Sequence, residues 1–215
     1  MGLKEGLTMS WIDMKMIDFQ ASLASGAATP GGGTVSAVAL GQSAALVAMV
    51  TELTIGNDKW REGWEISKSA KSKADDVMIE SNALADDDSL AFDQVMAAFK
   101  LPKSNDIEIA ARRTSIRQAT LEAAEIPYKT ATLAIKLLKE ILPLSEYCNA
   151  NAISDVGVAT LLATAGCKGA LFNVEINLNS LPMELGQDMR SNIANISKEC
   201  RAISKEIMHV VKSRL

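Results

Sequence analysis

Three consecutive aspartates, Asp86, Asp87 and Asp88, lie within a stretch of helical periodicity and are the first candidates for chemistry. Counting back from Phe99 through Phe92 in helical steps places Asp88 on a stripe of apolar residues. Asp87 falls on the solvated face. Because an apolar environment raises the pKa of a carboxyl group toward the range useful for proton transfer, we expect Asp88 to be a proton-transfer group.

Two adjacent arginines, Arg112 and Arg113, bracket the buried face of the next predicted helix, so one of them can reach inward. An inward guanidinium can pair with an aspartate such as Asp88 and keep it ionised. The contact would be either an ion pair between helices or part of a ligand site. We take Arg112 as the candidate for substrate binding, with Arg113 as the alternative.

The remaining catalytic side chains are few. The one histidine, His209, lies off the apolar seam of the last predicted helix, which indicates a surface position. The sequence has no G-x-S-x-G elbow, no H-E-x-x-H and no carboxylate–histidine spacing typical of a metal site, so we predict no bound metal. The three cysteines are odd in number and form no C-x-x-C, which indicates neither a disulfide framework nor a thiolate metal site.

A glycine-rich segment, TPGGG at residues 29–33, precedes a long apolar stretch and matches neither a Walker sequence nor a dinucleotide motif. Its spacing alone predicts a tight turn. Gly31, Gly32 and Gly33 would also let a ligand approach the backbone, and the start of a helix offers unpaired N–H groups. We expect Thr34 to be the N-cap of that helix.

A second polar cluster lies between two apolar segments and contains Asn149, Asn151, Ser154 and Asp155. Ser154 or Asp155 can cap the helix that follows, but capping does not explain all four side chains. Asn151 and Ser154 are therefore candidates for substrate binding, and Asp155 is the alternative to Asp88 for proton transfer.

Helical periodicity dominates the chain and predicts an all-α fold, a single domain over residues 1–215 built as a bundle of long antiparallel helices. Pro143 should end the fourth long helix. Residues 172–178 alternate like a strand, yet Leu171, Val174 and Leu178 also satisfy helical spacing. We expect a helix there, because a lone strand would leave its backbone groups unpaired.

Composition narrows the class of protein. The 215 residues are 48% apolar and 4% aromatic, with a formal charge of −4 and no basic stretch, so no nucleic-acid partner is expected. The N-terminus has no run of signal-peptide length, which favours a cytoplasmic protein. The apolar stretch 35–50 is interrupted by Gln42 and Ser43 and followed by Glu52, so we expect a packed core helix and no membrane span.

Five ordered blocks of the sequence resemble the cyclodeaminase domain of formimidoyltransferase-cyclodeaminase and its free-standing relatives. They are TPGGGTVSAVALGQSAALVAMV from Thr29, LTIGNDKW from Leu53, ADDDSLAFDQVMAAFKLPK from Ala85, AAEIPYKTA from Ala123 and NANAISDVGVATLLA from Asn149. Together they run over most of the chain, which makes the resemblance far more specific than any one block.

The resemblance implies an all-helical homodimer that acts on the one-carbon unit of a tetrahydrofolate derivative. Either water opens the methenyl ring to the formyl form, the cyclohydrolase reaction common among free-standing chains, or a formimino group closes that ring with loss of ammonia. Both reactions pass through a tetrahedral carbon and need a proton transferred to or from a nitrogen or an attacking group. Surfaces of small residues, such as Ala44, Ala45 and Ala48, would permit close packing in the dimer.

The positions that match the family include the glycine segment, Lys59, Asp86, Asp88 and the cluster from Asn151 to Asp155. The resemblance implies that the pterin and its glutamate lie between Gly31–Gly33, Lys59 and that cluster, with Asp86 also binding substrate. Asn57 and Asp58 replace part of a lysine run of the family, which removes positive charge that a polyglutamate tail would contact. A non-catalytic helical interaction protein would explain the apolar stripes equally well.

Overall fold

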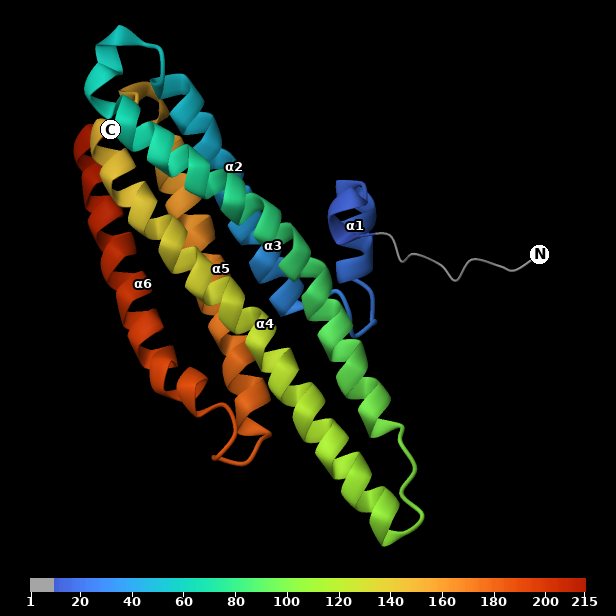
Figure 1. Ribbon diagram of the computed structural model, residues 1–215. Helices are drawn as coiled ribbons and strands as arrows, with labels where there is room; N and C mark the ends of the chain where they lie inside the picture. The colour runs from blue at the N-terminus through green and yellow to red at the C-terminus, as the bar shows by residue number, and fades with distance from the viewer. Residues whose placement is uncertain (1–9) are drawn as a thin grey trace.

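The computed structural model describes residues 10–215, so the prediction about the extreme N-terminus lies outside the described residues (Figure 1). The α-helices are α1 (Met16–Leu23), α2 (Gly32–Thr54), α3 (Trp64–Phe99), α4 (Asp106–Tyr147), α5 (Ile153–Asn179) and α6 (Gln187–Arg214). The short 3₁₀ turns are η1 (Trp11–Asp13), η2 (Asp58–Gly63) and η3 (Ala150–Ala152). No strand occurs in residues 10–215, which confirms the all-α prediction, and the strand-like segment 172–178 is part of α5.

Helices α2, α3, α4 and α5 form an antiparallel bundle in which each helix packs against the next and α5 packs back against α2. Helix α6 covers α4 and α5, and it lies to the left of them in Figure 1. The short helix α1 stands beside the bundle, apart from the five long helices. The C-terminal end of α3 and the start of α4 extend beyond the bundle as a two-helix hairpin (Figure 1).

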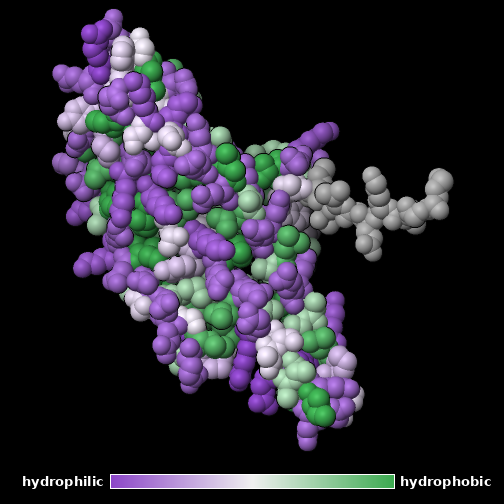
Figure 2. Space-filling view, viewed as in Figure 1, coloured by the Kyte–Doolittle hydropathy of each residue, from purple (hydrophilic) through white to green (hydrophobic). Residues whose placement is uncertain are grey.

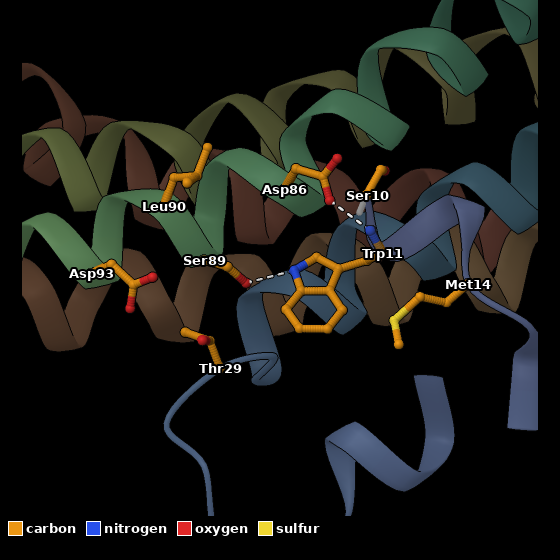
Figure 3. A pocket seen from close by; sticks show the side chains of 8 residues that line it. All are labelled: Ser10, Trp11, Met14, Thr29, Asp86, Ser89, Leu90 and Asp93. Carbon is orange, nitrogen blue, oxygen red and sulfur yellow. Dashed lines mark hydrogen bonds between the residues drawn. The ribbon is translucent and has the colours of Figure 1, made fainter. Parts of the chain in front are cut away.

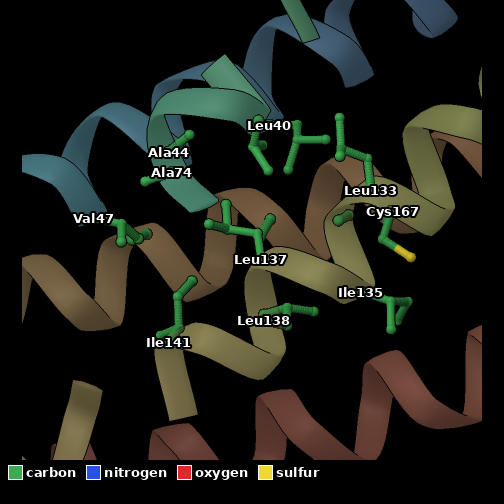
Figure 4. Close-up of a cluster of buried hydrophobic side chains, with 14 of the residues drawn as sticks. Leu40, Ala44, Val47, Ala74, Leu133, Ile135, Leu137, Leu138, Ile141 and Cys167 are labelled. Atoms are coloured by element: carbon green, nitrogen blue, oxygen red, sulfur yellow. The ribbon is translucent and has the colours of Figure 1, made fainter. Parts of the chain in front are cut away.

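The core lies where the long helices face one another, and its side chains are mostly aliphatic (Figure 4). Leu40 of α2 and Leu137, Leu138 and Ile141 of α4 are fully buried, and each such side chain contributes about 1.5–3 kcal/mol relative to an exposed one. Gly166 of α5 lets α2 approach closely, because an added Cβ would lie 2.8 Å from a backbone carbonyl oxygen of α2.

Two expected helix ends are wrong. Helix α4 continues through Pro143 to Tyr147, because proline removes only one backbone hydrogen bond and the next residue, Leu144, is fully buried in the core. Helix α2 begins at Gly32 with Gly31 as its N-cap, so Thr34 lies inside the first turn. The Asn105 side chain caps α4 by accepting a hydrogen bond from the backbone N–H of Glu108.

The surface formed by α3, α4 and α6 is largely hydrophilic, with smaller apolar areas between the charged side chains (Figure 2). Two segments, α2 and Ala150–Asn179, have the length and apolar composition of a membrane span, but 56% and 50% of their most apolar windows are buried in the bundle. The core helices of soluble proteins have the same property. Parts of α2 and α5 nevertheless keep apolar side chains on the surface of the single chain.

Candidate functional site

Asp88 on α3 lies against the first turn of α2. Its Oδ2 accepts a hydrogen bond of 3.0 Å from the hydroxyl of Thr34, which is fully buried. Gly33 faces the same carboxyl group, and an added Cβ at this glycine would overlap the carboxylate. The start of α2 therefore holds Asp88 through one hydrogen bond and through the absence of a side chain at Gly33.

Burial raises the pKa of the Asp88 carboxyl above its ordinary value of 3.8. Hydrogen bonds from the hydroxyl and the backbone N–H of Thr34 act in the opposite direction and lower this pKa, but burial is the larger cause. The direction agrees with the expectation from sequence. A carboxyl group in this state can exchange a proton closer to neutral pH than an exposed aspartate can.

The reason for that burial differs from the expected one. We expected Asp88 to share a buried stripe with Phe92 and Phe99, but these side chains are 38% and 50% exposed. They lie on the C-terminal part of α3, where Arg112 of α4 lies over the Phe99 ring but both phenylalanines keep a large exposed surface. Asp88 is shielded by the first turn of α2 instead. Asp87 is exposed, as its position on the solvated face predicted.

The N-terminal turn η1 joins this site through Trp11. Its backbone N–H donates to Asp86 Oδ1 over 2.9 Å, and its indole N–H donates to Ser89 Oγ over 2.9 Å (Figure 3). The Ser89 and Thr34 hydroxyl oxygens are 3.1 Å apart. Trp11, Ser89, Thr34 and Asp88 thus form one connected set of hydrogen bonds, drawn from three elements that are far apart in the sequence.

A cavity of about 480 Å³ opens beside these residues. The side chains that give it chemical character are Trp11, Met14, Thr29, Asp86, Ser89 and Asp93 (Figure 3). Its volume lies within the range of small-molecule sites, and it combines an aromatic ring with two carboxylates. A planar ligand that carries positive charge or several N–H donors would fit this lining.

The three glycines of the TPGGG segment differ in what they require. An added Cβ on Gly31 or Gly32 would meet its nearest neighbour at 3.6 Å, an ordinary contact. Gly33 is buried and has no such space, because the Asp88 carboxylate occupies it. The close approach that we expected for a ligand at these glycines is therefore made at Gly33 by a side chain of the protein.

The second predicted cluster lies at the opposite end of α2. The Asn149 backbone N–H donates to Thr54 Oγ1 over 3.0 Å, and its side chain donates to the Leu53 carbonyl over 3.0 Å. Asn149 also caps η3 by accepting from the backbone N–H of Asn151. Asn149 thus has a structural role, because its hydrogen bonds attach the cluster to the end of α2.

Ser154 and Asp155 do not cap α5. That helix begins at Ile153, so both residues lie within its first turn, with Ser154 exposed and Asp155 half-buried. Asn151 is also exposed. The expectation that Ser154 or Asp155 is the N-cap is wrong because η3 runs directly into α5 and leaves Ala152 at the cap position.

Lys59 lies in η2, just beyond the C-terminal end of α2, and its ammonium group is 4.9 Å from the centre of the Trp60 ring. It is exposed and lies at the same end of α2 as the cluster from Asn151 to Asp155. The 23 residues of α2 separate this end from Gly31–Gly33 by about 34 Å. Within one chain, the expected substrate-binding residues other than Arg112 therefore form two groups, one at each end of α2.

Arg112 does not reach an aspartate. Its guanidinium donates to the backbone carbonyl of Phe99 and lies 5.5 Å from the centre of that ring, in the hairpin where α3 ends. Arg113 is exposed. The expected pairing with Asp88 is wrong, because both arginines lie more than two turns beyond the region where α3 faces α2. Arg112 instead satisfies a carbonyl group at the end of α3.

Residues 10–215 contain no group of three or more histidine, cysteine or acidic side chains arranged to hold a metal ion. His209 is exposed, as predicted. Sequence reasoning missed Trp11, Ser89 and the role of Thr34. Ser89 directly follows the aspartate triplet and Thr34 directly follows the glycines, so the hydroxyl beside each motif could have indicated these two residues. Nothing in the local sequence pattern indicated Trp11.

Known proteins with similar sequences and structures point to one family. The model of the formiminotransferase-cyclodeaminase family matches residues 15–211. A methenyltetrahydrofolate cyclohydrolase of Methylorubrum extorquens is 35% identical over 198 residues, which cover 92% of this chain and 95% of that protein. A formimidoyltransferase-cyclodeaminase of Rattus norvegicus is 26% identical over 97% of this chain, which spans only 39% of the length of that relative.

A solved structure agrees. The crystal structure described as formiminotetrahydrofolate cyclodeaminase from Thermotoga maritima superimposes with a TM-score of 0.78 and 26% identity, over 95% of this chain and 96% of that one. The family match covers nearly the whole described part of the chain, and one relative exceeds 30% identity over almost its full length. The chain therefore belongs to the formiminotransferase-cyclodeaminase family.

Proposed function

We propose that this folate one-carbon enzyme is a methenyltetrahydrofolate cyclohydrolase, which opens the 5,10-methenyl ring to 10-formyltetrahydrofolate. The observation that carries the proposal is the 35% identity to a cyclohydrolase that is matched over 95% of its own length. The bifunctional formimidoyltransferase-cyclodeaminase of Gallus gallus, at 30% identity, is matched over only 35% of its length.

The charge of the cavity supports a methenyl substrate. The methenyl carbon bridges N5 and N10 as a cation, and Asp86 and Asp93 present two carboxylates to the cavity, where such a cation would be stabilised. The Trp11 ring offers a planar surface for a pterin or for the delocalised cation. A planar ligand with neither positive charge nor N–H donors would gain nothing from the two carboxylates.

The reaction removes both protons of the attacking water and delivers one proton to N5, so one proton is released overall. Water adds to the methenyl carbon and gives its first proton to a base; the hydroxyl of the tetrahedral intermediate then loses its proton as the N5–carbon bond breaks and N5 takes a proton, which leaves the formyl group on N10. We assign the first transfer to ionised Asp88, because its pKa is raised and it faces the first turn of α2 beside the cavity. Asp155 is the alternative, at the other end of α2.

Formimidoyltetrahydrofolate cyclodeaminase is the second candidate function. It is favoured by the structural similarity to the Thermotoga maritima protein, whose chain is matched over 96% of its length. The same two carboxylates would then stabilise the methenyl cation as product, and the departing ammonia would need the proton. The fold and site suit both reactions, so the activity must be measured with each substrate.

The experiment that separates the two uses the full-length protein and both folates. Loss of the methenyl chromophore with purified protein would show cyclohydrolase activity, and we expect it to be at least about tenfold faster than chromophore gain from the formimino substrate. Ring closure with ammonia release, and no hydrolysis, would replace the cyclohydrolase by the cyclodeaminase. An absence of turnover with both substrates would overturn the enzyme assignment.

We further propose a homodimer formed through α2 and α5. These neighbouring antiparallel helices carry exposed or half-buried apolar side chains on one face, at helical spacings of three, four and eleven. On α2 they include Val35, Leu46, Met49 and Leu53, and on α5 they are Val158, Leu161, Phe172 and Ile176. The α5 side chains are 47%, 55%, 69% and 69% exposed, respectively, which is high for four apolar residues on one helix.

The area of this face suits a stable interface. The face is about 34 Å long and two helices, or about 20 Å, wide, which gives roughly 700 Å² per chain. A typical specific interface buries about 800 Å² per partner. Of the small residues that suggested a dimer in the sequence, Ala45 and Ala48 are half-buried, but Ala44 is fully buried in the core of its own chain and is unavailable to a partner.

A two-fold axis that crosses α2 near its midpoint would reverse the direction of the helix in the second copy. The Gly33 and Asp88 end of one chain would then face the end of the partner that carries Lys59 and the cluster from Asn151 to Asp155. Such a dimer would reunite the two groups of expected substrate-binding residues, which are about 34 Å apart within one chain. The positive charge of Lys59 would suit the glutamate carboxylates of the folate.

Leu161→Glu tests this interface. Leu161 lies near the middle of the face, so the two-fold axis would bring two such glutamates together, and we expect the dimer to dissociate at micromolar concentration with loss of activity. Ile79→Glu, at a 69% exposed position on α3, is the matched control and should remain dimeric and active. Sedimentation velocity measures the oligomeric state of each variant, and the folate assay measures its activity. A wild-type monomer or an active dimeric Leu161→Glu variant would contradict the proposal.

A further inference from the structure

A continuous chain of hydrogen bonds joins Asp88 to the cavity. Thr34 donates to Asp88 Oδ2 over 3.0 Å, and the Thr34 and Ser89 hydroxyl oxygens are 3.1 Å apart. Ser89 lines the cavity and accepts the indole N–H of Trp11 over 2.9 Å (Figure 3). Thr34 is fully buried and Ser89 is 6% exposed, so bulk water does not compete for these two hydroxyls.

The two ends of the chain fix its direction. An indole N–H can only donate and an ionised carboxylate can only accept, so one arrangement of protons satisfies every member. Ser89 accepts from Trp11 and donates to Thr34, and Thr34 donates to Asp88. Each hydroxyl accepts one hydrogen bond and donates one, and hydrogen bonds arranged in such a chain strengthen one another. All the protons point from the cavity toward Asp88.

The segment that ends this chain is attached to the bundle by few contacts. The Trp11 ring meets Phe19 edge-on, with 6.3 Å between ring centres, and Phe19 is the one buried residue of α1. Met16 and Ile17 of the same helix are 61% and 71% exposed. Little buried apolar surface opposes a movement of Trp11 away from Ser89 when a ligand enters the cavity.

We propose that Ser89 and Thr34 are positioning residues that form a proton relay from the cavity to Asp88. The Trp11 indole N–H donates to Ser89 Oγ at the place where a water molecule donates during the reaction. The inference rests on the proposed function, in which ionised Asp88 is the base. When the indole N–H of Trp11 turns away from Ser89 while the ring stays at the cavity, a water molecule donates to Ser89 Oγ. The water proton passes to Ser89 Oγ. At the same time the Ser89 hydroxyl proton passes to Thr34 Oγ1, and the Thr34 hydroxyl proton passes to Asp88 Oδ2. The water becomes the attacking hydroxide, both hydroxyls stay neutral, and Asp88 becomes the neutral acid.

Charged groups around Asp88 stay constant in the test variants. Those nearest along α3 are Asp86 and Asp87, and Asp93 lines the cavity; Glu122, Glu125 and Lys129 of α4 line surface hollows together with Asp87. Asp13 ends η1 and Lys15 precedes α1. The first three turns of α2 carry no titratable side chain, and α5 brings the neutral Asn173 next to Gly32. Because the variants change none of these residues, a change in the pKa of Asp88 among them reports the hydrogen-bond chain.

Kinetics of the full-length enzyme test the relay. Thr34→Val and Ser89→Ala should each lower kcat by at least about tenfold, and Thr34→Ser should restore it, because serine keeps the hydroxyl. Neither variant should lower kcat further in the Asp88→Asn background, where the relay has no base to serve. Wild-type kcat in Ser89→Ala would overturn the relay, since Asp88 would then reach its substrate without that hydroxyl.

An NMR titration gives a readout that does not depend on turnover. The Asp88 carboxyl resonance is identified by its absence in Asp88→Asn. We expect the pKa of Asp88 to rise in Thr34→Val, to rise by less in Ser89→Ala and in Trp11→Phe, and to stay unchanged in Phe19→Leu, which loosens α1 but keeps the chain intact. An unchanged pKa of Asp88 in Ser89→Ala would overturn the relay. A wild-type protein inactive on both folates would overturn the proposed function instead, and the titration would still decide whether the hydrogen-bond chain acts on Asp88.

Discussion

Asp88→Asn is expected to lower kcat by about 10²–10⁴-fold, the usual contribution of a general acid or base. Asparagine has nearly the same shape as aspartate and keeps an oxygen that can accept the Thr34 hydroxyl, so the first turn of α2 should stay in place. The measurement follows the methenyl chromophore at saturating substrate. Since the substitution removes a proton acceptor rather than a binding surface, KM should change much less than kcat.

Stability provides the control for this variant. Burial raises the pKa of Asp88 in the folded protein, so the protonated form stabilises the fold and this contribution is lost as the pH rises through the folded pKa. Ionised Asp88 therefore costs stability at neutral pH. Asp88→Asn should melt at the same or a higher temperature than wild type at pH 7. This difference in melting temperature should vanish at pH values below the ordinary pKa of aspartate. A folded Asp88→Asn variant with wild-type turnover would eliminate Asp88 as the base.

The same variant tests whether the site is shared between two copies. Asp88→Asn and Lys59→Glu chains, co-expressed with different tags and purified as the mixed dimer, would together contain one site with both Asp88 and Lys59 and one with neither, because the proposed dimer brings Lys59 of one chain to the Asp88 end of the other. The mixed dimer should then show about half of the wild-type activity, although each parent dimer is impaired. If each site were built from one chain, both sites of the mixed dimer would be impaired and no activity would return.

The helices could be predicted from the sequence because their apolar residues recur at helical spacing. The same reasoning placed residues 172–178 in a helix, although they alternate like a strand. It failed at Phe92 and Phe99, where the spacing of a buried face continues but neighbouring elements leave 38% and 50% of the two side chains exposed. Periodicity shows which side chains share a face, and only the lengths of the neighbouring helices decide whether that face is covered.

The site was predicted in part. Asp88 and the glycines could be found because an acid and a glycine run are recognisable residue by residue. Their contact could not, since Gly33 and Asp88 are 55 positions apart and meet only through the packing of α2 on α3. Lys59 matched the family pattern, yet it lies at the far end of α2 from the glycines, because a helix of 23 residues separates the two in the sequence.

Gly33→Ala is expected to have the second largest effect, a loss of about 10²-fold in kcat with a small change in melting temperature. The added Cβ would overlap the Asp88 carboxylate, which is the end of a short, rotatable side chain. The carboxylate can turn away at low cost in stability, but it then loses the Thr34 hydroxyl and its position beside the cavity. Activity should therefore fall far more than the free energy of unfolding, because proton transfer depends on geometry to within about 1 Å.

Gly32→Ala is the matched control, since its Cβ would meet only the Asn173 side chain at an ordinary 3.6 Å. At saturating substrate it should keep wild-type kcat, and it should keep the wild-type melting temperature, while a change in KM would report contact of this glycine with the substrate. The double variant Gly33→Ala with Asp88→Ala separates the two explanations for a loss in Gly33→Ala. Removing the carboxylate frees the space, so any stability lost in Gly33→Ala should return while activity stays low. Equal kcat in Gly33→Ala, Gly32→Ala and wild type would show that Asp88 does not need its place against α2, and would move the proton-transfer role to Asp155.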